Sequence, residues 1–354
     1  MKSKFKKIII IIYVSVSVVF ILVGGIFVLV KFKNYCQKTY KAELSSDIYD
    51  SKGVDKLFDE GKYEEAINKI DNFLKKNPNN TEALDDKSYA LISLDKNEEG
   101  ILVINKILNK DPEDGDALNN ISWAYNNLEL YNIADNYADK ALKLYPNDEY
   151  IMVNKANALY GLKEYDDALK YYDKAAEKND KMEYAHWGQG LVYYHKKDYK
   201  KAIECFLKYK QLIGKDDSSN KDDDKDDNKD ADKRIADLYV KLNDYDNAAK
   251  IYQSEIENDS KNYDAYYSLG DVYLKQKEYE KSIDCYNSII NKAPDEAEAY
   301  YEKSICLYQL GKKDDAIDNL KIAINFDEEY IHDAIDEPML DDLRSDPEFK
   351  NLIK

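Results

Sequence analysis

Hydrophobic residues follow two different patterns along this chain. Residues 8–30 form an unbroken run without a charged side chain, IIIIIYVSVSVVFILVGGIFVLV. From residue 47 to residue 330, small and large apolar residues instead recur with a period of 34 among charged ones. The first pattern predicts one membrane-spanning helix, and the second predicts an array of helical repeats.

The period is marked by alanines in phrases of one kind, such as KYEEAI at 62–67 and EYDDAL at 164–169. Numbering each unit so that this alanine is position 20 gives eight units, which begin at residues 47, 81, 115, 149, 183, 229, 263 and 297. Position 8 is small in seven units, position 17 is tyrosine in six, and four of the six prolines fall at position 32. The alanines are Ala66, Ala134, Ala168, Ala202, Ala248 and Ala316.

These positions predict two helices in each unit. Helices approach closely only where small side chains meet, as positions 8 and 20 would, and large residues at positions 11 and 24 fill the space beside the crossing. Proline at position 32 lacks a backbone N–H and ends the second helix. Each unit leaves an apolar face that its neighbour covers, so stacking builds a continuous core.

The pattern resembles the tetratricopeptide repeat family over residues 47–330. Unit seven, YDAYYSLGDVYLKQKEYEKSIDCYNSIINKAPDE, is nearly a full match, whereas unit one departs at Asp50 and Gly53 and unit two at Asn97. The resemblance implies an all-α, right-handed α-solenoid of about eight helix-turn-helix repeats, or six or seven if those two units do not form. Residues 331–354 are predicted to be capping helices, with apolar residues at helical spacing: Ile331, Ile335, Leu340, Leu343, Phe349 and Leu352.

An acidic insert divides the repeats into 47–216 and 229–330. Units five and six begin 46 residues apart, 12 more than the period, and the surplus is residues 217–228. A calcium-binding loop starting at Asp222 would need glycine at its sixth position, where Asp227 stands, and glutamate at its twelfth, where Lys233 stands. We interpret the insert as a solvated loop, since each doubling of loop length costs only about 0.6 kcal/mol. A docking tail is the alternative.

The N-terminal residues predict a membrane anchor. Residues 1–7 are basic, and a helix over 8–30 would be about 35 Å long, enough for a hydrocarbon core of about 30 Å. The run ends in VKFK without a small-x-small cleavage motif, so the span is predicted to remain uncleaved, followed by a juxtamembrane linker over 31–46. Lysines flank both ends; the tighter cluster before the span favours an extracytoplasmic body over a cytoplasmic one.

Charge and the scarcity of certain residues exclude several functions. Six of the 52 basic residues and none of the 70 acidic residues precede residue 34, so the remainder carries a net charge of −24 and repels nucleic acid. The histidines, His186, His195 and His332, lack metal-ligand spacing, and the four cysteines lie far apart. No phosphate-binding loop or nucleophile motif occurs. The sequence predicts no catalysis, no cofactor and no metal.

By resemblance to the family, a concave groove is lined by positions 2, 5, 9 and 12 of each unit. Eleven of these 32 positions are aromatic, and nine are acidic, five of the acids in units six to eight. Aromatic residues are the usual anchors of interfaces, although family consensus also favours tyrosine here. The predicted partner-binding residues are Tyr89, Trp123, Asn126, Asn157, Tyr160, Tyr184, Trp187, Tyr194, Asp237, Tyr267, Asp271, Tyr301 and Tyr308.

The sequence therefore predicts a membrane-anchored scaffold that binds a protein or peptide with an aromatic or apolar segment beside a basic one. The peptide-carboxylate clamp of chaperone-binding relatives needs lysine and asparagine in consecutive units, and only Asn157 and Lys233, in non-adjacent units, approach it. That partner class is excluded. The alternative function is binding of cell-wall polymers or other carbohydrates by the groove aromatics; an enzyme would require a pocket of perturbed acids or histidines.

Overall fold

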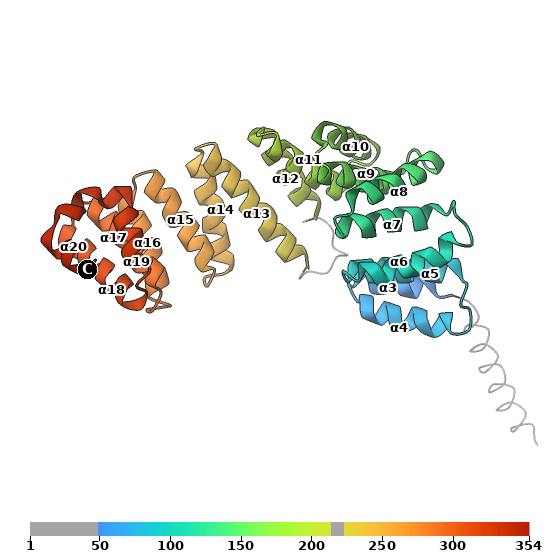
Figure 1. Cartoon of the computed structure of the whole chain (residues 1–354), viewed down its shortest axis with the longest axis horizontal. Coiled ribbons are helices and arrows are strands. Elements are labelled where there is room, and N and C mark those ends of the chain that lie inside the picture. Colours follow the sequence, from blue (N-terminus) through green and yellow to red (C-terminus); the bar gives the residue numbers. More distant parts are fainter. Residues whose placement is uncertain (1–48, 214–222, 354) are drawn as a thin grey trace, which may run out of the picture. The chain divides into compact units, whose positions relative to one another are not determined.

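The computed structural model describes residues 49–213 and 223–353, and every regular element in these ranges is helical (Figure 1). The expected helical repeat solenoid is thereby confirmed for the described chain. The predicted basic tail 1–7, span 8–30 and linker 31–46 lie outside the described residues. Within the described ranges, no helix combines the length and the apolar character needed to cross a membrane. The chain divides into two compact units between Leu144 and Tyr145.

Unit 1 contains three helix pairs. Small and aliphatic side chains such as Val54, Ala66 and Ile70 are completely buried between the first helices. A second buried cluster lies between the later helices, around Ile104 and Ile121. The elements are α3 (Ser51–Asp59), α4 (Tyr63–Leu74), α5 (Thr81–Ser93), α6 (Asn97–Leu108), α7 (Gly115–Asn127) and α8 (Tyr131–Leu144).

Unit 2 contains five helix pairs and a C-terminal segment. Its pairs are α9 (Glu149–Gly161) with α10 (Tyr165–Lys178), α11 (Glu183–His195) with α12 (Tyr199–Ile213), α13 (Asp223–Lys241) with α14 (Tyr245–Asn258), α15 (Tyr263–Lys275) with α16 (Tyr279–Ile290), and α17 (Ala297–Gln309) with α18 (Lys313–Phe326). Consecutive helices pack against one another throughout the unit, including α12 against α13 across the insert.

The helix boundaries follow the 34-residue numbering closely. The second helix begins at position 17 in all eight pairs, whether that residue is tyrosine, Asn97 or Lys313. The turn before it places position 15 in the left-handed backbone region each time. Only two of these eight residues are glycine: Gly61 and Gly311 have φ of 65° and 75°, and the other six are Asp95, Glu129, Lys163, Lys197, Asn243 and Lys277.

The first two 34-residue repeats, which begin at residues 47 and 81, both form despite their departures from the pattern. Asp50 caps α3, because its side chain accepts a hydrogen bond from the backbone N–H of Gly53 at 3.3 Å. Asn97 is 2% exposed; its Nδ2 donates to Asp95 Oδ1 at 2.7 Å, and its Oδ1 accepts from Asn127 Nδ2 at 3.1 Å. At position 17 of this repeat, a fully hydrogen-bonded asparagine amide thus replaces the usual tyrosine.

Small residues at positions 8 and 20 are required by close helix crossing, as predicted. The six marker alanines are each at most 1% exposed. A Cβ added to Gly190 or Gly270, both at position 8, would lie 2.6 Å from the Phe206 ring or 2.8 Å from the Tyr286 ring, closer than carbon atoms normally approach.

The prediction of a loop over the whole insert is wrong in its second half. Helix α13 begins at Asp223, so residues 223–228 continue the first helix of the next pair backwards; residues 214–222 lie outside the described chain. The physical reason is that aspartates are favourable in the first turn of a helix, where they face the positive end of its dipole.

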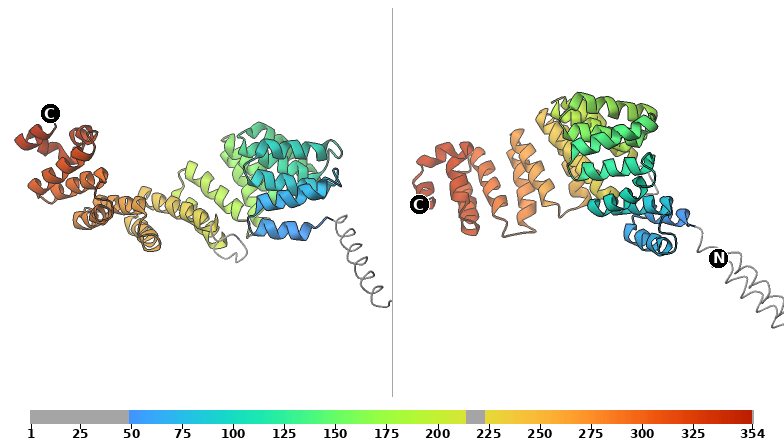
Figure 2. Two further views of the ribbon diagram at one scale, coloured as in Figure 1. Left: turned by 90° about the horizontal axis from the view of Figure 1, so that it is seen from below. Right: turned by 45° about the vertical axis from the view of Figure 1, so that its right-hand side comes forward.

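The C-terminal residues cover the last helix pair. They form α19 (Tyr330–Asp336), the 3₁₀ helix η1 (Pro338–Ser345) and α20 (Pro347–Leu352), which contact α17 and α18; Figure 2 shows them in red, gathered at the C-terminal end of unit 2. Leu340, Leu343 and Phe349 are at most 2% exposed and complete a core cluster with Leu320 and Ile324.

Candidate partner-binding surface

The structure places every predicted partner-binding residue on the first helix of a pair. We call the side chains at positions 2, 5, 9 and 12 of these helices the first-helix surface. In unit 1 it carries Tyr89 on α5 and Trp123 and Asn126 on α7. The other ten residues belong to unit 2: Asn157 and Tyr160 on α9, Tyr184, Trp187 and Tyr194 on α11, Asp237 on α13, Tyr267 and Asp271 on α15, and Tyr301 and Tyr308 on α17.

Unit 1 presents a continuous row of aromatic rings. The ring centroids of Phe58 and Tyr89 are 5.1 Å apart, and those of Tyr89 and Trp123 are 5.6 Å apart. Trp123 also packs against the core cluster around Ile121, whereas Tyr89 is 38% exposed. Tyr89, the middle ring of the row, is therefore the most accessible of the three.

Acidic residues accompany this row. Burial, together with the nearby carboxylates of Asp116 and Asp114, raises the pKa of Asp85 to about 7, although Asn120 Nδ2 donates to its Oδ1 at 3.0 Å. The pKa of Asp86 is also raised, chiefly by burial. The negative charges of these carboxylates are therefore only partly balanced by hydrogen-bond donors and positive charges within unit 1.

Trp187, the proposed anchor of unit 2, is packed on several sides. Its ring centroid lies 5.0 Å from that of Phe206 and 4.9 Å from that of Tyr209, and the guanidinium of Arg234 lies over the ring at 5.1 Å. Arg234 in turn donates through Nε to Asp230 Oδ2 at 3.0 Å. Tyr184 and Tyr194 on the same helix are 58% and 38% exposed. A partner would reach these tyrosines before it reached the tryptophan.

A hollow of about 330 Å³ lies beside Tyr194, between α11, α12 and α13. Tyr194 and Phe206 supply aromatic walls, and Arg234, Asp237 and Lys241 supply charges of both signs. Asp237 Oδ1 accepts a hydrogen bond from the Tyr252 hydroxyl at 3.2 Å. Such a hollow can hold one large apolar side chain while its rim pairs with main-chain donors and acceptors.

One recurrent contact was not foreseen from the sequence. A tyrosine at position 24 donates its hydroxyl to the polar residue at position 9 of the same repeat: Tyr172 to Asn157 at 2.6 Å, Tyr252 to Asp237 at 3.2 Å, and Tyr286 to Asp271 at 3.4 Å. The co-occurrence of Tyr at 24 with Asn or Asp at 9 was the available signal. These bonds fix the orientation of the position-9 side chains.

The remaining aromatic sites differ in accessibility. Tyr160 on α9 is half-buried and packs near Tyr165 and His195, with ring centroids 5.7 and 5.5 Å away. Tyr301 is only 7% exposed, and its ring centroid lies 5.0 Å from that of Tyr330 in the capping segment, which makes Tyr301 a poor anchor.

Acidic side chains gather on the first helices α15 and α17, on the first-helix surface and beside it. Burial, followed by the neighbouring charges of Asp271 and Glu298, raises the pKa of Glu302 to about 8. Burial also raises the pKa values of Asp271 and Glu298, and Lys275 offsets the effect at Asp271. Glu302 occupies position 6, outside the four positions considered from the sequence, and its electrostatic coupling to Asp271 on α15 is a tertiary contact. Within the described residues, no group of three or more histidine, cysteine or acidic side chains is placed to hold a metal ion.

Two family models match the chain. One, described as the N-terminal TPR repeats region of Psidin, matches residues 48–166, and another, described as a tetratricopeptide repeat, matches residues 153–217 and 233–296. No curated protein matches the chain.

Several solved structures are similar at low sequence identity. YrrB, described as a TPR protein with an unusual peptide-binding site, is 22% identical with a TM-score of 0.44, covering 59% of this chain and 97% of YrrB. PilF of Pseudomonas aeruginosa is 18% identical with a TM-score of 0.48, covering 60% of this chain and 92% of PilF. The APC/C heterotetramer Cut9–Hcn1 is 16% identical with a TM-score of 0.48, covering 85% of this chain and 55% of that chain.

Proposed function

Because the family models support placing this chain in the tetratricopeptide repeat family, whose members bind protein or peptide partners, we propose that it is a membrane-anchored scaffold that binds such a partner on its first-helix surface. The proposal rests chiefly on α11 and α13, where exposed Tyr194 lines the hollow together with Arg234 and Asp237, and exposed Tyr184 lies nearer the start of α11. Residues 8–30 serve as the anchor, with the repeats outside the cytoplasm.

The partner in this proposal carries an aromatic or apolar side chain next to a basic segment. The aromatic side chain occupies the hollow beside Tyr194, and the basic segment lies along the acidic residues of α15 and α17. Burial is the main cause of the raised pKa values of Asp271, Glu298 and Glu302, and repulsion from neighbouring carboxylates adds to it at Glu298 and Glu302. An approaching cation would offset that repulsion, which supports this choice.

Site-specific photo-crosslinking of the full-length protein in its native membrane tests where the partner binds. A crosslinking amino acid replaces Tyr184 in one variant and Leu207 in another; Leu207 is 46% exposed on α12, the second helix of the same pair. We expect one protein to crosslink from position 184 and not from 207. Equal capture from both positions, or capture of wall polymer alone, would contradict the proposal.

Binding measurements with the captured partner then separate the two contributions. Tyr194→Ala should cost about 2 kcal/mol of affinity, mainly through faster dissociation, whereas Leu207→Ala should cost little. Asp237→Asn with Asp271→Asn should instead slow association and flatten its salt dependence. If Tyr194→Ala and Trp187→Ala both leave affinity unchanged in a folded protein, the partner binds elsewhere.

The membrane side can be tested with an introduced cysteine. The native Cys285 and Cys306 are buried, and Cys205 is only partly exposed, so they report poorly on accessibility. Leu102 is 66% exposed on α6, and Leu102→Cys provides an accessible thiol. Labelling of this variant in intact cells by a membrane-impermeant thiol reagent, beyond the labelling of the unsubstituted protein with its Cys36, would place the repeats outside. Additional labelling only after lysis would place them in the cytoplasm.

A further inference from the structure

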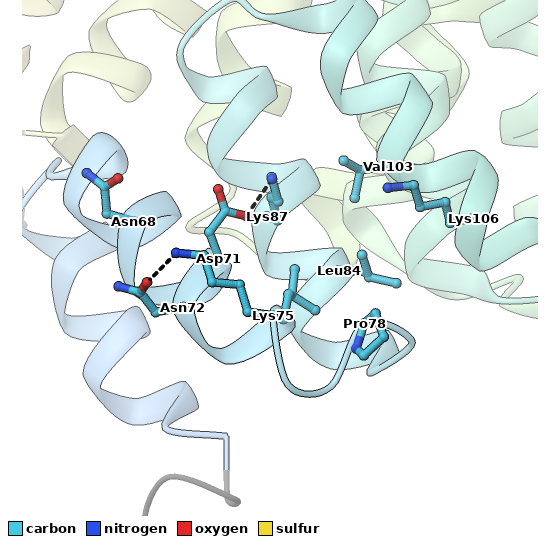
Figure 3. Close-up of a pocket in the computed structure, with 10 residues that line it drawn as sticks. Asn68, Asp71, Asn72, Lys75, Pro78, Leu84, Lys87, Val103 and Lys106 are labelled. Atoms are coloured by element: carbon cyan, nitrogen blue, oxygen red, sulfur yellow. Dashed lines mark hydrogen bonds and ion pairs between the residues drawn. The ribbon is translucent and has the colours of Figure 1, made fainter.

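A second hollow, of about 420 Å³, lies in unit 1 between α4, α5 and α6 (Figure 3). None of its lining residues occupies positions 2, 5, 9 or 12, so it is separate from the first-helix surface. Its polar lining comprises Lys75, Lys87, Lys106, Asn68, Asn72 and Asp71. This site is independent of the proposed scaffold function.

The charge of this hollow is opposite to that of the unit around it. Residues 49–144 contain 12 lysines and 20 acidic residues, a net charge of −8. Three lysines and one aspartate line the hollow, which gives it a net charge of +2. Random placement on so acidic a surface would favour the reverse, so the gathering of lysines indicates a site for an anion.

The three lysines are held in different ways. Lys87 Nζ donates to Asp71 Oδ1 at 2.5 Å, and its side chain is only 22% exposed. Lys75 Nζ donates to Asn72 Oδ1 at 2.9 Å. Lys106 has no carboxylate within ion-pair distance among the described residues, and Figure 3 shows it extending from α6 towards α5 and Lys87. Two positioned lysines and a third without an acidic partner therefore line the same hollow.

The rest of the lining is apolar. Leu74, Leu84 and Val103 contribute side chains to the hollow, and Leu84 and Val103 are largely buried in the core cluster beneath it. A volume of this size lies in the range of small-molecule sites, which combine apolar walls with a few placed polar groups. The hollow thus suits a ligand with both a charged and an apolar part.

We propose that this hollow binds a phosphate monoester on an apolar or aromatic carrier. A phosphate monoester carries a charge between about −1.5 and −2 at neutral pH and three acceptor oxygens, which matches a net charge of +2 and three lysines. The asparagine amides supply further donors, and the carrier contacts the leucines and Val103. A carboxylate offers one charge and would leave the lysines less well neutralised.

Calorimetric titration of the full-length protein in neutral detergent tests the site with defined probes. Phenyl phosphate should bind saturably, more tightly than phenyl sulfate, which has a similar shape but one charge, and more tightly than inorganic phosphate, which lacks the ring. Lys106→Gln should weaken binding of phenyl phosphate about tenfold, the loss expected for one charge-assisted hydrogen bond. Because Lys106 has no ion pair to lose, the Lys106→Gln variant should have the same melting temperature as the wild type.

Lys110→Gln is the matched control, since Lys110 follows the same helix and loses the same charge but does not line the hollow. It should leave binding nearly unchanged. Equal weakening by the two substitutions would mean that binding depends only on the overall charge of the protein, and it would overturn the proposal. Binding of phenyl sulfate as tight as that of phenyl phosphate, or binding that does not saturate, would overturn it too. A phosphotyrosine tripeptide distinguishes the sources: tighter binding than phenyl phosphate indicates a protein-borne phosphate, and weaker binding indicates a free small molecule.

Discussion

Replacement of Gly190 by alanine gives a sharp test of the helix crossing in the fifth repeat. A Cβ at this position would lie 2.6, 2.8 and 2.9 Å from Cε1, Cδ1 and Cζ of Phe206. Favourable carbon–carbon contacts lie at about 3.5–4.0 Å, so the ring or the helix must move by most of an ångström. Phe206 is 1% exposed and has little free space.

Two opposing terms set the magnitude. An extra methyl group in a tightly packed core costs about 1–3 kcal/mol. Alanine is better than glycine in a helix interior by about 1 kcal/mol, which offsets part of that cost. The net expectation for Gly190→Ala is a loss of about 1 kcal/mol in the free energy of unfolding.

A double-mutant cycle makes the reasoning refutable, because the sign of the effect should reverse. Phe206→Leu removes Cε1 and Cζ, two of the three ring atoms nearest to the added methyl group. In that background Gly190→Ala should no longer destabilise and should gain up to about 1 kcal/mol. Urea unfolding of the four proteins, followed by circular dichroism, gives the coupling energy; a value below about 0.5 kcal/mol would mean that the two residues do not compete for space.

Three further predictions concern other parts of the fold. Ala168→Leu should destabilise by about 1–3 kcal/mol, because Ala168 is completely buried at a helix crossing, and an unchanged melting temperature would show that the 34-residue numbering is wrong. Lys197→Gly should stabilise by about 0.5 kcal/mol by removing a left-handed lysine, whereas Lys208→Gly inside α12 should destabilise by about 1 kcal/mol in the same melting assay. The folded pKa of Glu302 is raised to about 8, so its protonated form favours folding: this contribution is complete below about pH 4.5 and lost as pH rises through 8. Glu302→Gln should therefore lose less melting temperature than the wild type between pH 5 and pH 9, and identical profiles would contradict the burial of this carboxyl.

The repeat architecture was predictable because its packing rule acts on residue size at fixed positions. Close crossing demands small residues at 8 and 20, so Ala66, Ala168 and their equivalents mark the period directly. The turn at position 15 left no such mark. Its backbone is left-handed in every repeat, but six of the eight residues are not glycine, because the helices on both sides hold the turn and impose the strain locally.

The surface was less predictable than the core. Position numbers identify which helix face a residue occupies, and Tyr184 and Tyr194 are exposed. The position numbers do not show that Arg234, one repeat later, would stack over Trp187, or that Tyr301 would lie beneath the capping segment. Those contacts depend on the rotation between neighbouring repeats, which is a tertiary quantity.

The helix crossings require buried, well-packed apolar side chains, whereas the first helices also carry partly buried carboxylates that destabilise the fold. The repeat arrangement allows both. Core residues such as Phe206 and Tyr286 fill the space beside position 8 and stabilise each repeat with its neighbours. Asp85 and Glu302 have raised pKa values, so keeping them ionised at neutral or higher pH destabilises the fold. Because each repeat contacts mainly its neighbours, that cost stays local and does not disturb distant crossings. A basic partner segment lying over Glu302 would lower its pKa and stabilise the repeats that bind the segment.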